Sequence, residues 1–165
     1  MIAVSNTTPL RYLIAIEQEH LLGQLFETVF VPAAVHEELT EAGAPKKVRI
    51  RVLSLPTWYE VQAVHETHET TFPVALHRGE REAILLAEAV HPDLILIDEH
   101  IGRTIASARN LPVSGTLGVL ERADVMGFIS DFPGILRLLK ASGFYIAESL
   151  EQQLVQRHRT RQEDK

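Results

Sequence analysis

Carboxylate and amide side chains follow apolar segments of this sequence at points where buried strands are expected to end. The apolar run at residues 94–97 is followed directly by Asp98 and Glu99, and the run at residues 2–5 is followed by Asn6. Carboxylates brought together at buried positions repel one another unless something compensates their charge. Mg²⁺ would do so, because it prefers oxygen ligands and is typically held by a few carboxylates and water. Such a metal can activate water and stabilise charge at a phosphorus centre, so these residues indicate a divalent metal site.

A third acid lies near the start of a strongly predicted helix. Glu80 falls in the first turn of the helix expected from residue 79 to residue 90. It shares an apolar stripe with the residues three, four and seven positions later, and a carboxylate on such a stripe needs a partner. Glu82 has similar apolar neighbours but lies farther from the helix start, so Glu80 is the preferred candidate.

A fourth acid lies on a helix expected at residues 33–42. Glu38 follows Val35 by three residues and Val31 by seven, which places it on the buried side. Glu37 aligns with Glu41 and is expected to be exposed.

The elements that must position these residues alternate between strands and helices. Strands are expected at 2–5, 28–32, 48–55, 94–97 and 112–114, and helices at 10–16, 20–26, 33–42, 79–90, 101–110, 116–127, 133–143 and 147–158. Thr8 before Pro9 is expected to cap the first helix. The alternation predicts an α/β fold with a central parallel sheet covered by helices on both faces. Residues 56–77 are not assigned.

The topology predicts where the candidate residues meet. Ligands of open parallel sheets bind beyond the carboxyl ends of the strands, and the helices leading into such strands begin at that same edge. Asn6, Glu38, Glu80 and Asp98 are therefore expected to gather at one end of the sheet, with Glu99 nearby. Each residue also has a simpler interpretation: Asp98 and Glu99 as a helix cap and first-turn acid, Asn6 as a turn residue, and Glu38 as a surface residue. Their convergence is what favours a metal site.

Length and composition exclude several classes of protein. The 165 residues are 45% hydrophobic and 23% charged, typical of one globular domain, with residues 155–165 expected as a basic, polar tail. The absence of cysteine excludes thiol catalysis and a disulfide scaffold. No signal peptide is recognisable, and no apolar run approaches the roughly 18 residues that span a membrane, so a cytoplasmic location is expected.

Basic residues are clustered despite a formal net charge of −6. One group, at residues 46–51, contains Lys46, Lys47, Arg49 and Arg51, and another lies at 157–161. Short charge runs are usually solvated faces. The alternative is that they contact nucleic acid, because local charge matters more than the total.

Five segments of the sequence resemble the PIN domain family. They are "VSNTTPLRYL", "VPAAVHEEL", "LHRGEREAILLA", "LILIDEHIGRTIA" and "LPVSGTLGVL", the last resembling a bacterial and archaeal subfamily with a Gly-Thr step after the last strand. The similarity extends from about residue 2 to about residue 155. Each motif is short, but their order and spacing together are fairly specific.

The resemblance implies a three-layer α/β/α sandwich and a Mg²⁺- or Mn²⁺-dependent ribonuclease, often the toxin of a toxin–antitoxin pair. It implies an RNA substrate, an antitoxin protein as a possible partner, and a homodimer. By the resemblance, the site positions are Asn6, Glu38, Glu80 and Asp98. The family most often has Asp at the first position; the amide of Asn6 can coordinate a metal but brings no charge. Roles that go with a nuclease are substrate positioning by Thr7, Thr8 or Thr116, and RNA contacts by Lys46, Lys47 and Arg49.

Other interpretations stay open or are excluded. Asn6 favours a module that keeps the fold and binds RNA or a protein without turnover. His65 and His68 are a weak zinc pair, because their spacing departs from the H-E-x-x-H pattern. A dinucleotide site and a P-loop are excluded, because no G-x-G-x-x-G follows a strand and "SGTLGV" lacks lysine. A phosphoacceptor domain is excluded because Asn6-Thr7 is not an acidic pair.

Overall fold

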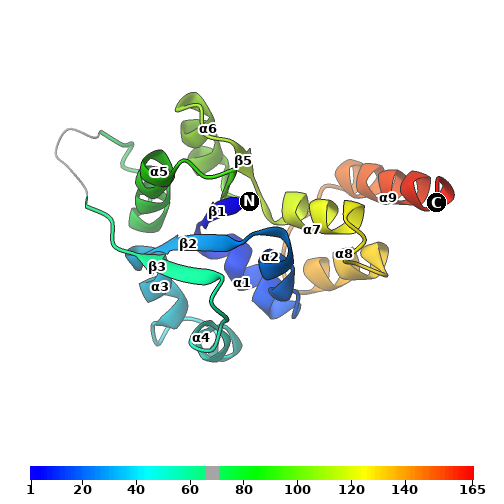
Figure 1. The fold of residues 1–165 in the computed structure, drawn as a ribbon, viewed down its shortest axis with the longest axis horizontal. Coiled ribbons are helices and arrows are strands. Elements are labelled where there is room, and N and C mark those ends of the chain that lie inside the picture. The colour runs from blue at the N-terminus through cyan, green and yellow to red at the C-terminus, as the bar shows by residue number, and fades with distance from the viewer. Residues whose placement is uncertain (66–70) are drawn as a thin grey trace.

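A five-stranded parallel sheet forms the centre of the molecule (Figure 1). The computed structural model describes residues 1–65 and 71–165. The sheet has the order β3-β2-β1-β4-β5, and all its pairings are parallel. Its strands are β1 Ile2–Ser5, β2 Thr28–Pro32, β3 Tyr59–Gln62, β4 Leu94–Leu96 and β5 Val113–Ser114. The expected fold class, α/β with a central parallel sheet, is confirmed.

Helices cover both faces of this sheet. They are α1 Thr7–Ala15, α2 His20–Leu25, α3 Ala33–Thr40, α4 Lys46–Val52, α5 Arg78–Val90, α6 His100–Ala108, α7 Thr116–Val125, α8 Phe132–Ala141 and α9 Glu148–Glu163. Figure 1 shows α5 and α6 on one side of the sheet and α1, α3 and α4 on the other. No helix in the described parts of the chain is both long and apolar enough to cross a membrane.

Strand side chains alternate between two separate cores. Ala3 of β1 and Leu96 of β4 pack into the larger core with α1–α4 and α7–α9, whereas Val4 and Ile95 pack into the smaller core with α5 and α6. This alternation is the period of two that a strand imposes on its side chains. The chain therefore forms a three-layer α/β/α sandwich.

Strand register places the ends of β1 and β4 side by side. Ser5 is the register partner of Leu96, and the backbone N–H of Asn6 donates to the Leu96 carbonyl at 3.0 Å. Asn6, one residue after Ser5, and Asp98, two residues after Leu96, therefore leave the sheet at the same edge. Parallel pairing is what brings residues more than ninety positions apart in sequence to one place.

The strand predicted at residues 48–55 is wrong, because this segment is the helix α4. Val48, Ile50 and Val52 alternate with polar residues and so fit a strand, but Val48 and Val52 also stand four apart, as on one helix face. Both valines are buried, whereas Ile50 is 59% exposed. The strand of this region is β3, which lies in the segment that the sequence left unassigned.

Most helix boundaries also differ from the prediction by one or more residues. Asn6, not Thr8, is the N-cap of α1, which begins one residue before Thr8 and places Pro9 third in the helix. Helix α3 ends at Thr40, before the expected boundary. Helix α9 continues to Glu163, beyond the expected helix end at residue 158, so most of the basic, polar segment 155–165 is helical.

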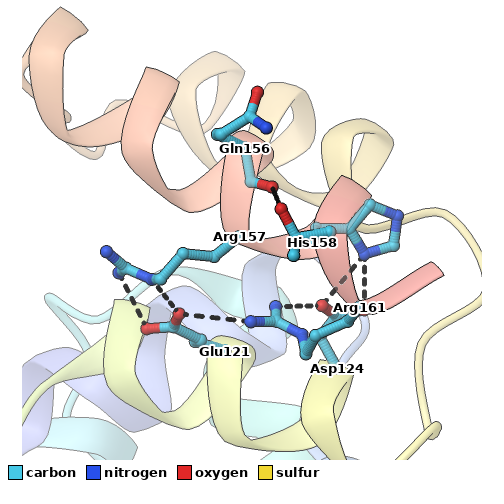
Figure 2. Close-up of polar contacts among 7 residues, drawn as sticks. Glu121, Asp124, Gln156, Arg157, His158 and Arg161 are labelled. Atoms are coloured by element: carbon cyan, nitrogen blue, oxygen red, sulfur yellow. Dashed lines mark hydrogen bonds and ion pairs between the residues drawn. The ribbon is translucent and has the colours of Figure 1, made fainter. Parts of the chain in front are cut away.

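Polar contacts with α7 hold the C-terminal part of α9 (Figure 2). His158 Nδ1 lies 2.9 Å from both carboxylate oxygens of the buried Asp124, and Arg161 also contacts Asp124. Arg157 Nε donates to Glu121 at 2.6 Å. Arg157 and Arg161, both in the basic group at residues 157–161, thus form ion pairs that attach α9 to α7. This contact gives their charge a structural role.

Asp124→Ala is expected to destabilise the protein by about 2–4 kcal/mol, because His158 and Arg161 would then lie at a partly buried site without their acceptor. Chemical denaturation followed by circular dichroism measures the loss. Glu163→Ala, at the exposed C-terminal end of α9, is the control and should change stability little. Equal effects of the two variants would contradict a packing role for the contact.

Candidate functional site

A cavity of about 530 Å³ lies at the edge of the sheet where β1 ends. Its wall contains Asn6 and the carboxylates of Glu38, Glu80 and Glu99. Three of the four predicted site residues, with the predicted neighbour Glu99, therefore line one cavity. The fourth, Asp98, is not part of that wall.

Asn6 enters the cavity from the turn between β1 and α1. It is only 3% exposed, and its backbone is fixed by the bond to Leu96 described above. Although Asn6 is the N-cap of α1, its side chain does not cap that helix. Instead its amide donates from Nδ2 to Glu99 Oε2 at 3.2 Å.

Glu99 is held at the cavity by α1. One of its oxygens accepts from Asn6, and the other accepts a short hydrogen bond from the hydroxyl of Thr8. Glu99 is the N-cap residue of α6, yet its side chain does not cap α6. The carboxylate is thus directed away from its own helix and toward the cavity.

Asp98 makes its hydrogen bonds with the start of α7. Its two oxygens accept from the backbone N–H of Thr116 at 2.8 Å and from the Thr116 hydroxyl at 2.6 Å. Burial raises the pKa of Asp98, and the bonds from Thr116 offset part of that rise. Gly115 makes this contact possible, since a Cβ there would lie 2.6 Å from Asp98 Oδ1.

Glu38 reaches the cavity from α3. Its Oε2 accepts from the hydroxyl of Thr7 at 2.7 Å. Its Oε1 lies where a side chain at Gly79 would clash, because a Cβ on Gly79 would be 2.7 Å away. Gly79 was not predicted as a site residue; the signal in the sequence is a glycine directly before a buried glutamate.

Glu80 is the most buried carboxylate of the cavity wall, at 6% exposed. It is the third residue of α5 and forms a capping box with His77, whose N–H donates to Glu80 Oε2 at 3.0 Å. Burial raises the pKa of Glu80; the His77 N–H lowers it, and the charges of Glu99 and Glu38 raise it further. Glu80 is therefore close enough to Glu38 and to Glu99 to be repelled by both charges.

Glu80 and Glu82 have different roles in the structure. Glu82 is also buried, but it accepts from the N–H of Ala34 at 3.3 Å and from Arg78 Nε at 2.8 Å. Its carboxylate is thus used to join α3 to α5, and it does not line the cavity. The preference for Glu80 agrees with this geometry.

The donor atoms around the cavity suit a hard divalent cation. Carboxylate and amide oxygens are the ligands that Mg²⁺ and Mn²⁺ prefer, and repulsion among the acids would be relieved by a cation. Within residues 1–65 and 71–165, no three His, Cys, Asp or Glu side chains form a ready-made metal cage. Mg²⁺ does not need one, because it keeps several waters and binds through one or two carboxylates.

Two arginine side chains and one histidine side chain border the same cavity. Arg11, His77 and Arg78 line it, and Arg78 is paired with Glu82 and, at 3.1 Å, with Glu37. Pro45 and Val48, at the start of α4, also line it. The basic residues of α4 therefore begin next to the cavity.

The predicted RNA-contacting residues on α4 differ in their surroundings. Lys47 donates to the Ala15 carbonyl at 3.2 Å and lies 3.7 Å from Glu17. Arg49 is half-buried, whereas Lys46 is exposed at the first position of the helix.

The hydroxyls of Thr7 and Thr116, predicted to position substrate, bond to Glu38 and Asp98. The possible zinc pair cannot be placed, because His68 lies outside the described residues.

Comparison with known proteins identifies the family to which the chain belongs. A family model described as a PIN domain matches residues 2–160. The structure of a PilT N-terminus domain protein from the archaeon Sulfolobus solfataricus P2 aligns with it at 15% identity and a TM-score of 0.49, over 90% of this chain and 98% of that one. That structural similarity is too low to carry an argument. No curated protein matches the sequence significantly.

Glu80→Gln is expected to stabilise the metal-free protein at pH 7. The folded-state pKa of Glu80 is raised above its ordinary value of 4.5, so its ionisation destabilises the fold as pH rises through that raised pKa. The amide oxygen of Gln can still accept from His77. Denaturation at pH 4 and pH 7 should show a gain at pH 7 that shrinks at pH 4; a gain equal at both would contradict the assignment.

Thr116→Val is expected to destabilise the protein by about 1.5–3 kcal/mol, because it removes a hydroxyl bonded to a charged carboxylate. Thr116→Ser keeps the hydroxyl and should retain most of the stability. Urea denaturation of the two variants at pH 7 measures the difference. Equal loss in both would mean that the methyl group of Thr116, not its bond to Asp98, matters.

Proposed function

Because the chain belongs to the PIN domain family, whose members are typically nucleases, we propose that it is a metal-dependent ribonuclease that hydrolyses phosphodiester bonds of RNA. The observation that carries the proposal is the cavity itself. Carboxylates from three separate elements, Glu38, Glu80 and Glu99, face it together with the amide of Asn6. The charges of Glu38 and Glu99 both act unfavourably on Glu80, and a cation in the cavity would relieve that repulsion.

The proposal assigns roles to residues of this chain. One or two of the carboxylates of Glu38, Glu80 and Glu99 would hold Mg²⁺ or Mn²⁺, with the side-chain oxygen of Asn6 and water completing the ligands. The metal would supply an activated water and stabilise negative charge at the reacting phosphorus. Thr7 and Thr8 orient two of the carboxylates through their hydroxyls.

The basic residues around the cavity would attract the RNA backbone. Arg11 lies at the cavity wall, where a guanidinium group can bind a phosphate through paired hydrogen bonds, and Arg78, already bonded to Glu82 and Glu37, would add its charge. Lys46, at the adjacent start of α4, would extend this contact, with Lys47 and Arg49 beyond it. The expected homodimer and the expected antitoxin partner stay predictions.

The test is cleavage of a panel of structured and single-stranded RNAs by the purified protein with Mn²⁺ or Mg²⁺. Glu38→Gln should reduce cleavage by at least about 100-fold, because it removes a charge from the metal site. Glu37→Gln is the matched control: it is the neighbouring residue of α3, exposed, and its carboxylate pairs with Arg78. It should keep most of the activity.

A chelator should abolish cleavage by the wild type. Cleavage that survives both the chelator and Glu38→Gln would contradict the proposal. RNA binding without cleavage, unaffected by divalent metal, would instead favour the second candidate, a module that binds RNA without turnover. The neutral Asn6 at the first metal position is the observation that favours this second candidate.

A further inference from the structure

We propose that Glu99 supplies the negative charge that Asn6 lacks, so that Asn6 and Glu99 together act as one charged unit of the metal site. This inference rests on the proposed function for the part that concerns metal. Its basis is the hydrogen bond of 3.2 Å from Asn6 Nδ2 to Glu99 Oε2, across the cavity edge. The pair then needs one negative charge, and Glu99 supplies it while Asn6 stays neutral.

The two residues are brought together by the sheet. β1 and β4 are neighbouring parallel strands, and Asn6 is fixed by its backbone bond to Leu96. Its side chain is almost completely buried, so it has little freedom to turn from Glu99. Thr8 holds the other oxygen of Glu99. Both partners therefore have defined positions before any metal binds.

The charge of the pair depends on how many of its two residues are acidic. The amide of Asn6 donates to the carboxylate of Glu99, and the pair carries one negative charge. An aspartate at position 6 would place two carboxylates at hydrogen-bonding distance, where they cannot both ionise without a proton or a cation between them. Glu80 already interacts unfavourably with the charge of Glu99. A further negative charge would add to that repulsion.

The neighbouring acid cannot take this role in the observed arrangement. Both oxygens of Asp98 accept hydrogen bonds from Thr116, and Asp98 does not line the cavity. Of the two acids that follow β4, Glu99 is thus the one that faces Asn6. Asp98 is a positioning residue that ties the end of β4 to the start of α7.

A double-mutant cycle tests the pairing without any metal. Asn6→Asp should lower the Tm of the metal-free protein at pH 7 by roughly 2–4 °C, the shift typical of about 1 kcal/mol in a domain of this size. Adding Glu99→Gln should restore the Tm, because the Gln amide can donate to the new Asp carboxylate. Additive effects of the two substitutions would overturn the inference.

Mn²⁺ affinity, measured by isothermal titration calorimetry, tests the contribution to the metal site. Glu99→Gln should weaken binding at least about tenfold, and Asn6→Asp combined with Glu99→Gln should recover most of it, because the charge returns at position 6. Failure of the double variant to recover would overturn the charge assignment.

The two measurements separate the inference from the proposed function. Coupled unfolding in a protein that binds no Mn²⁺ rejects the ribonuclease proposal but supports the pairing of Asn6 with Glu99. Mn²⁺ binding with additive unfolding effects supports the ribonuclease site and overturns the pairing.

Discussion

Repulsion among carboxylates at the edge of a parallel sheet is the constraint on which the site depends. Parallel strands direct their carboxyl ends to one edge, so residues that follow them are brought together whatever their charge. Here Glu80 is buried beside the charges of Glu99 and Glu38, and its pKa is raised. The fold tolerates this cost because the surrounding layers, two hydrophobic cores on opposite faces of the sheet, hold the elements in place.

Hydrogen bonds donated by residues at the starts of helices moderate that repulsion. Thr7 bonds to Glu38, Thr8 to Glu99, and the N–H of His77 to Glu80. Each donor is local to a helix start, where backbone and hydroxyl groups are available. They orient the carboxylates toward a common cavity, where their charge would be available to a divalent cation.

The fold class followed from the sequence because short apolar runs alternate with amphipathic helices, whereas local choices depended on packing. Residues 48–52 satisfy both a strand and a helix pattern, and only the burial of Val48 and Val52 on one face decides between them. The strand β3 lies at the edge of the sheet, with two exposed residues in four, and so carries little apolar signal. At the site, sequence could not tell which of Asp98 and Glu99 faces the cavity, because the choice depends on Thr116, 18 residues farther on.

The central claim is that this cavity holds a divalent cation among Glu38, Glu80 and Glu99. Anomalous diffraction from crystals grown with Mn²⁺ tests it most directly, because the peak locates the ion without reference to activity. The account predicts a peak inside the cavity, within about 2.0–2.6 Å of at least one of these carboxylates, with water completing the coordination. A peak elsewhere on the protein, or none at millimolar Mn²⁺, would contradict it.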